Sequence, residues 1–143
     1  MSIIRSLDKQ RNLFFVVWDG VVVWEDWFKH VRSLMADADW LAAPRFIASL
    51  QSVTDTSTIG DREVEQVRAV LDANREKMAG KRGAIVASEE FWKAKRFGEV
   101  IAPFGASVVV FNSLDTACAF LGIDWAETQP MIERLRARLR DSG

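Results

Sequence analysis

An unbroken apolar segment near the start of the chain, LFFVVW at residues 13–18, constrains the fold most strongly. Its Val, Phe and Trp side chains favour β-structure, and the Asp19-Gly20 pair that follows is typical of a turn. The segment therefore predicts a strand. A shorter strand at residues 3–7 is expected to pair antiparallel with it across residues 8–12.

The segment after Gly20 allows two interpretations. Asp-Gly between β-forming residues is a hairpin signal, which would make residues 21–23 a return strand. Against this, apolar residues at helical spacing follow, and Glu25 and Asp26 suit a first helical turn. We therefore expect a strand, a turn and then a helix over residues 24–36.

Strand-like and helix-like segments alternate along the rest of the chain. Residues 40–44 are expected to be a connection, because Pro44 favours extended geometry before it. The expected strands are 45–50, 84–87 and 107–111, and the expected helices are 64–78, the segment between Ser88 and Pro103, 114–121 and 129–140. This order predicts an α/β fold: a mixed five-stranded sheet whose later strands are parallel, with helices packed on it.

Length and composition narrow the class of protein. A chain of 143 residues favours one domain over 1–143, with residues 124–143 as a C-terminal amphipathic helix extension. A net charge of −1 argues against charge-driven binding to nucleic acid or anionic membranes, and no apolar run approaches the roughly 18 residues of a membrane span. Residues 1–5 lack the layout of a signal peptide. The single cysteine, Cys118, fits a reducing compartment, so we expect a cytoplasmic protein.

Four segments, taken together, resemble a known family: LFFVVWDGVVVWEDW, FIASLQSVTDTSTIGDREV, GAIVASEEF and ASVVVFNSLDTACAFLGI. Their order and rhythm, over roughly residues 2–123, are similar to those of the SpoIIAA-like branch of the STAS family, the anti-sigma-factor-antagonist fold. That branch also resembles the lipid-carrying CRAL-TRIO proteins in general architecture. The resemblance implies a SpoIIAA-like fold and a non-enzymatic bacterial module that works by association with a protein partner.

The resemblance also points to the loop between residues 52 and 64. In STAS antagonists, a serine at this strand-to-helix junction, within a D-S-[ST]-G-like turn, is phosphorylated by a partner kinase. Ser57 is the closest match here, with Thr56 and Thr58 as alternatives. This chain departs from the pattern, because Asp55 is not adjacent to Ser57 and no glycine directly follows the hydroxyl run.

The residues of this loop leave two roles open. Hydroxyl and backbone N–H groups at a helix start can bind an anion such as phosphate. Alternatively, Thr58 and Asp61 fit a capping box, in which side chains satisfy the first amide groups of the helix. Both roles could hold at once.

Polar residues follow each of the expected parallel strands. In open α/β sheets, ligands bind outside the carboxyl ends of such strands, so these residues could form one ligand-binding rim. The alternative is that each hydroxyl only caps its own helix. The expected rim consists of Thr54, Asp55, Ser88, Asn112 and Ser113.

Candidate catalytic and metal-binding groups are few. His30, the single histidine, is expected to be solvated, with no nucleophile or orienting acid beside it. Cys118 falls on an apolar helix stripe and is expected to be a buried small side chain. No cluster of residues has metal-ligand spacing, and no phosphate-binding glycine motif is present. We therefore expect no enzyme, no metal and no cofactor.

Six tryptophans without a tyrosine suggest a second function. Most tryptophans are expected in the core. The CRAL-TRIO side of the resemblance implies an alternative: a carrier or sensor of a small apolar or lipid-like ligand. Its pocket would be lined by Trp24, Trp27, Phe28, Trp92 and Phe97.

The arginine-rich final helix also allows alternatives. The plainest is a solvated face whose apolar stripe docks on the domain. The others are an acidic partner, or a homodimer in which two subunits share the stripe.

Overall fold

A mixed five-stranded sheet forms the centre of the protein. The computed structural model describes residues 2–89 and 91–142. The strand order is β1-β2-β3-β4-β5, with β1 antiparallel to β2 and every other neighbouring pair parallel. The α/β fold predicted from the sequence is therefore confirmed. The strands are β1 (Ile3–Asp8), β2 (Leu13–Val21), β3 (Arg45–Asp55), β4 (Arg82–Ala87) and β5 (Ser107–Phe111).

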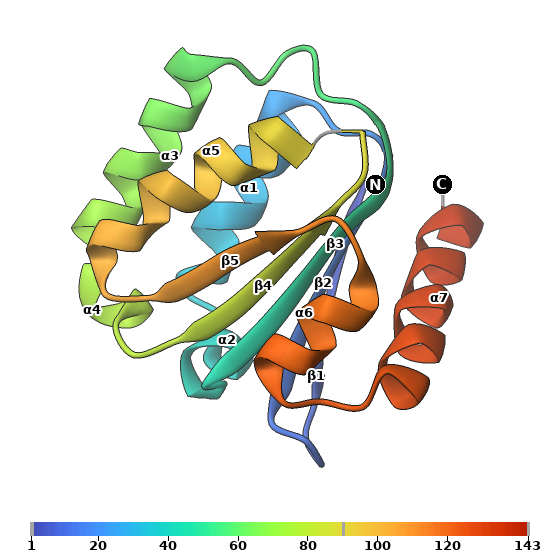
Figure 1. Cartoon of the computed structure of the whole chain (residues 1–143). Helices are drawn as coiled ribbons and strands as arrows, with labels where there is room; N and C mark the ends of the chain where they lie inside the picture. The colour runs from blue at the N-terminus through green and yellow to red at the C-terminus, as the bar shows by residue number, and fades with distance from the viewer. Residues whose placement is uncertain (1, 90, 143) are drawn as a thin grey trace.

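Helices cover both faces of this sheet (Figure 1). One face carries α1 (Trp24–Leu34), α2 (Ala38–Ala42), α3 (Asp61–Ala73), α4 (Arg75–Met78), α5 (Phe91–Ile101) and the 3-10 turn η1 (Ala102–Phe104). The opposite face carries α6 (Leu114–Leu121) and α7 (Trp125–Ser142). The sheet is thus the middle of three layers.

The apolar run of β2 is explained by this layering. Successive side chains of a strand point to opposite faces. Phe14 and Val16 pack toward α1 and α2, whereas Phe15 and Val17 pack toward α6 and α7. Both faces are buried, so the strand is apolar without alternation. β2 continues to Val21 beside β3, and the hairpin interpretation of residues 21–23 is wrong.

Helix α7 docks its apolar stripe on the sheet of its own chain. Ile132, Leu135 and Leu139 are each 2% exposed and join the core under Leu13 and Phe15. The stripe therefore docks on its own domain, which was the plainest expectation, and a homodimer stays a prediction. The helix also begins earlier than expected, at Trp125.

Two arginines of α7 bind the carboxyl-terminal ends of β2 and β3. Arg136 is buried and donates to Ser52 Oγ at 2.9 Å, and it also pairs with Glu133 at 2.7 Å. Arg140 donates to both carboxylate oxygens of Asp19 at 3.0 Å. The expectation of a solvated arginine face is wrong for Arg136, which is buried, whereas Arg140 is exposed while it pairs with Asp19.

Three other element boundaries differ from the sequence prediction. Residues 40–44 are not a plain connection, because the Asp37 carboxylate accepts from Asp39 N and Trp40 N and starts α2. β3 continues beyond residue 50 because its outer half pairs with β2. The helix expected over 64–78 is divided at Asn74 into α3 and α4.

Candidate ligand cavity

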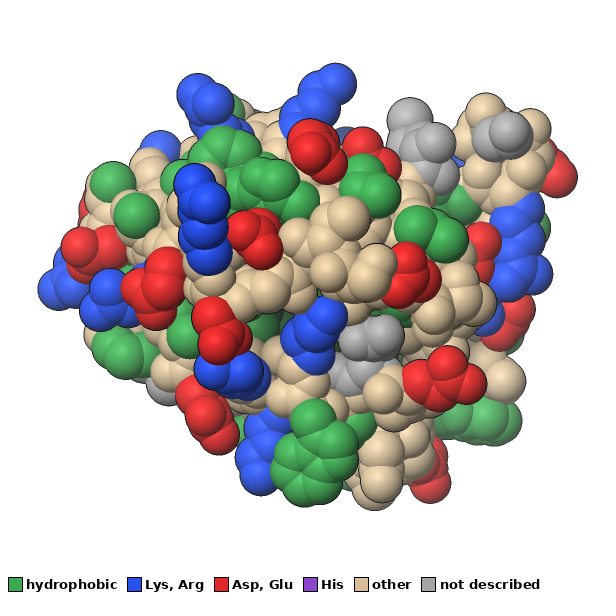
Figure 2. Space-filling view, turned by 90° about the horizontal axis from the view of Figure 1, so that it is seen from above, with side chains coloured by type: hydrophobic (Ala, Val, Ile, Leu, Met, Phe, Trp, Pro, Cys, Tyr) green, Lys and Arg blue, Asp and Glu red, His purple; other side chains and the backbone are tan. Residues whose placement is uncertain are grey.

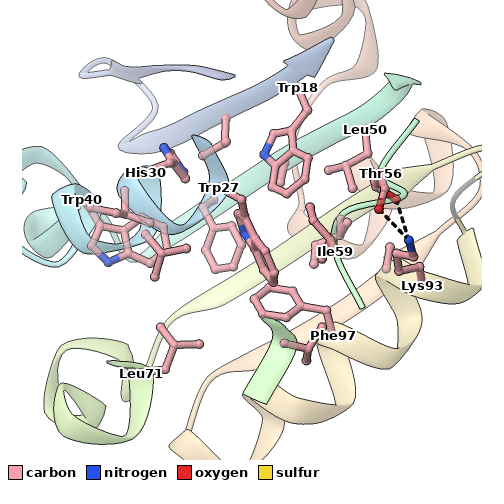
Figure 3. Close-up of a pocket in the computed structure, with 18 of the residues that line it drawn as sticks. Trp18, Trp27, His30, Trp40, Leu50, Thr56, Ile59, Leu71, Lys93 and Phe97 are labelled. Atoms are coloured by element: carbon pink, nitrogen blue, oxygen red, sulfur yellow. Dashed lines mark hydrogen bonds between the residues drawn. The ribbon is translucent and has the colours of Figure 1, made fainter. Parts of the chain in front are cut away.

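An apolar cavity of about 120 Å³ lies between the sheet and α1, α3 and α5. β2 and β3 supply the floor, which includes Val16, Trp18 and Ala48, and the helices supply the walls. Of the side chains that line it, His30, Thr56 and Lys93 carry polar groups other than an indole N–H. Figure 3 shows Thr56 and Lys93 at one end and His30 and Trp40 at the other.

Aromatic rings form the middle of the cavity wall. Trp27 is the contact point: its ring meets Trp18 edge-on at 6.0 Å and Phe97 edge-on at 4.9 Å, centroid to centroid. Trp27 shares the buried stripe of α1 with Val31 and Leu34, which explains its inward direction. Edge-to-face rings hold a defined spacing, which makes the wall rigid.

A lysine closes one end of the cavity. Lys93 on α5 donates from Nζ to Thr56 Oγ1 at 2.8 Å and to the Thr56 carbonyl oxygen at 2.9 Å (Figure 3). Thr56 is 3% exposed, at the turn between β3 and α3, where Ile59 N also donates to its carbonyl. The contact ties α5 to the hydroxyl-rich loop and places a positive charge beside an apolar space.

His30 lies at the opposite end and is neutral at physiological pH. Burial and, to a lesser extent, the nearby Arg5 charge lower its pKa from the usual 6.5 to about 4, although Asp37 acts in the opposite direction. Arg5 Nη1 lies 3.3 Å from Nδ1, so Nδ1 accepts and the proton resides on Nε2. The prediction of a solvated histidine is wrong. His30 follows Trp27 by three residues and precedes Leu34 by four, and this helical spacing was the available signal.

Trp40 carries an unsatisfied donor at the same end. Its Nε1 is the one buried side-chain polar atom without a hydrogen-bond partner among the residues described, and Trp40 is 2% exposed. The ring packs against Phe14 and Phe46, and Lys81 Nζ lies 4.5 Å from its centroid. Lys81 also donates to the carbonyls of Trp40 and Ala43, and it thereby holds α2 against β4.

The five residues proposed to form the apolar pocket are divided by the structure. Trp27 and Phe97 line the cavity. Trp24 and Phe28 stack on each other at 4.7 Å and border a separate shallow hollow on the outside of α1. Trp92 is 74% exposed and lies outside the lining. Sequence reasoning missed Trp18, Trp40 and Lys93. These three residues lie on different elements of the fold, so no periodic pattern in the sequence links them.

The hydroxyl loop uses its side chains for local bonds. Ser57 is exposed, and its Oγ and N donate to the two oxygens of Asp55 at 3.0 and 3.1 Å. Thr58 Oγ1 accepts from Trp24 N at 2.8 Å, which satisfies the first amide of α1. Thr58 therefore does not form the predicted capping box with Asp61.

The start of α3 is capped differently from the prediction. Gly60 is the N-cap residue, and its N–H donates to Glu63 Oε1 at 2.9 Å. Asp61 instead pairs with Arg96 of α5 at 2.8 Å. α3 and α5 are thus joined across the outside of the cavity.

The residues of the proposed rim lie at the ends of their strands and have separate surroundings. Thr54, Ser88 and Asn112 are exposed, and Asp55 is held by Ser57. Ser113 precedes α6 and its hydroxyl bonds Thr116, without capping the helix. A joint role for these residues stays a prediction.

Comparison with known proteins supports the fold. No protein-family model and no curated protein matches the sequence. A solved structure of an uncharacterized DUF3478-family protein from Shewanella loihica PV-4, described as having a SpoIIAA-like fold, superposes with a TM-score of 0.51. The two chains are 14% identical over 84% of this chain and 94% of that one.

The fold is SpoIIAA-like. The resemblance stated from the sequence is thereby confirmed at the level of the fold. At this identity the comparison does not extend to a ligand, a partner or an activity.

The remaining candidate groups of this SpoIIAA-like chain have structural surroundings. Cys118 is 1% exposed, as predicted, and burial raises the pKa of its thiol. Within residues 2–89 and 91–142, no group of three His, Cys, Asp or Glu side chains could hold a metal ion. The same residues contain no helix with the length and apolarity needed to cross a membrane. Acidic and basic side chains are intermingled on the face shown in Figure 2.

Proposed function

We propose that this protein is a non-enzymatic carrier or sensor of a small apolar ligand, which binds in the cavity between the sheet and α1, α3 and α5. The observation that carries the proposal is the apolar space of about 120 Å³ in an otherwise packed interior. Protein interiors contain few voids larger than a water molecule. At about 24 cal/mol per Å³, an empty space of this size costs roughly 3 kcal/mol, which a fitting ligand would offset.

The volume limits the size of the ligand. An engineered apolar cavity of about 150 Å³ in another protein takes up benzene. A cavity of about 120 Å³ therefore suits one ring or a short chain, and a two-chain phospholipid does not fit in this conformation. The ligand class is smaller than the lipid that the CRAL-TRIO resemblance implies.

Filling the cavity tests this function. Ala94 is 5% exposed and lines the cavity from α5, so Ala94→Leu places three further carbons in the space. We expect wild-type tryptophan fluorescence to respond saturably to toluene or benzene, because Trp18 and Trp27 lie in the wall, and we expect Ala94→Leu to lose the response.

The matched control is Ala69→Leu on the exposed side of α3, which should bind like the wild type. A flat titration of the wild type, or equal binding by Ala94→Leu with an unchanged melting temperature, would contradict the proposal.

A second candidate function is a regulatory module that associates with a protein partner and is switched at the loop. Ser57 and Thr58 are exposed, whereas Thr56 is buried against Lys93, which favours the first two as phospho-acceptors. A phosphate on Ser57 would be repelled by Asp55 and would break the bond between them. The same loop supplies Thr56 and Ile59 to the cavity, so the two functions would meet there.

Mass spectrometry of the protein isolated from its own host tests the switch. A covalent phosphate on Ser57 or Thr58 supports it. An unmodified loop, together with a Ser57→Asp variant that binds the same ligands with unchanged affinity, would count against it.

A further inference from the structure

We infer that the ligand of this cavity is a monocarboxylate, with an aryl or short alkyl body among the rings and its carboxylate at Lys93. This inference rests on the proposed function and specifies its ligand class.

The charge within the cavity is carried by Lys93. Among the described residues of the lining, Lys93 and His30 have titratable side chains. His30 is neutral above about pH 4, because burial lowers its pKa to about that value. At physiological pH the lining therefore carries one positive charge and, among its described residues, no negative one.

The partners of Lys93 among the described residues are neutral. Its Nζ donates to the hydroxyl and the carbonyl oxygen of Thr56 at 2.8 and 2.9 Å, and within the described residues no carboxylate pairs with it. These bonds have a charged donor but neutral acceptors. A carboxylate would add the attraction between two opposite unit charges, which is stronger beside an apolar space than in water, so it would bind Lys93 better than the Thr56 oxygens do.

The apolar walls restrict what accompanies the charge. Burying an anion in apolar surroundings is unfavourable unless it is paired, so only a ligand whose charge reaches the Lys93 end is accepted. The part of the cavity next to Lys93 is bounded by Trp27, Ile59 and Phe97 (Figure 3). These three side chains would contact the carbon atoms of a ligand, and none of them carries a positive charge. A single charge at one end of a small apolar body matches this arrangement.

Matched acid and amide probes test the inference. Phenylacetate and phenylacetamide have nearly the same shape and differ in charge. We expect calorimetry at neutral pH to give a Kd about tenfold lower for phenylacetate, because only the acid adds the attraction of a full negative charge to Lys93. Lys93→Met keeps the apolar stem of the side chain, so it should abolish this preference while phenylacetamide binds within about twofold of wild type.

Lys95→Met is the control, since Lys95 is an exposed lysine two residues away on the same helix; it should keep the preference. If the amide binds but the acid binds no better, or if the preference survives Lys93→Met, the inference is overturned and the proposed function stands. If neither probe binds the wild type, and neither do toluene and benzene, the proposed function fails as well.

Discussion

The two faces of the sheet are packed in different ways. Toward α6 and α7, aliphatic side chains such as Ala117 and Leu135 meet Phe15 and Val17, and all of these are at most 2% exposed. Toward α1, α3 and α5, the rings of Trp18, Trp27 and Phe97 meet edge-on around the cavity. Aliphatic side chains interdigitate to native density, whereas edge-to-face rings hold each other at a fixed spacing. The cavity therefore lies on the aromatic face of the sheet.

The largest expected effect is the loss of packing on the aliphatic face. Leu135→Ala should lower the free energy of unfolding by about 3 to 4 kcal/mol, because the surrounding core has little room to relax. Leu34→Ala, in the wall of the cavity, should lose only about 2 kcal/mol, since part of that side chain already borders empty space. Urea unfolding of both variants measures the difference, and equal losses would contradict the contrast between the two faces.

Acid should destabilise the aromatic face through His30. Its folded pKa of about 4 lies below the usual 6.5, so the unfolded chain takes up the proton first as the pH falls. This contribution is complete above about pH 6.5 and is lost between there and pH 4, up to about 3 kcal/mol. His30→Gln cannot titrate, so the difference between wild type and variant should be flat below pH 4 and should change over that window. A difference that stays constant across the window would show that His30 is not buried as described.

Two buried alanines offer a direct comparison of free space. Ala117 on α6 is 0% exposed in the aliphatic core, and Ala94 on α5 is 5% exposed beside the cavity. Ala117→Leu should destabilise by about 1 to 3 kcal/mol through overpacking, whereas Ala94→Leu should change stability by less than about 1 kcal/mol because the cavity accepts the added carbons. Thermal melts of the two variants decide this. A larger loss at Ala94 than at Ala117 would mean that the cavity is not available.

The smallest expected effect concerns the loop beside the aromatic face. Thr58→Ala removes the acceptor of Trp24 N and should lower stability by about 1 kcal/mol, as for other helix-start caps. Ser57→Ala is the matched control, since that hydroxyl bonds only Asp55 in the same loop, and it should lose less. Equal losses in chemical denaturation would assign no special role to the Thr58 contact.

The sequence allowed the elements and their order to be predicted because their signals are local. The run at residues 13–18 and the strand at 107–111 were located from apolar continuity, and α6 from its stripe and Gly122. The ends of some helices and strands were missed, because they depend on pairing with a distant strand or on a hydrogen bond to a side chain. β3 extends to Asp55 because β2 lies beside it, and α2 exists because the Asp37 carboxylate caps it.

The site was predicted less well than the fold. The sequence placed Trp27, Phe97 and Trp92 in one proposed pocket. Trp27 and Phe97 line the cavity, whereas Trp92 is exposed and lies outside its lining. Which side of a helix faces the sheet depends on the rotation of the helix about its own axis, and this rotation is set by packing against the rest of the fold. Lys93 was missed because a single charged residue beside an apolar stripe is usually solvated.

The sequence by itself determined that β2 is buried, that helices alternate with parallel strands and that Cys118 lies in the core, because each follows from the period of apolar residues along the chain. Only the tertiary structure decided that His30 is half-buried and neutral, that Lys93 meets Thr56, and that Arg136 and Arg140 bind the sheet. These outcomes depend on residues far apart in the chain. A pKa, an ion pair and a cavity are set by what surrounds a group in space, and the local pattern does not encode that.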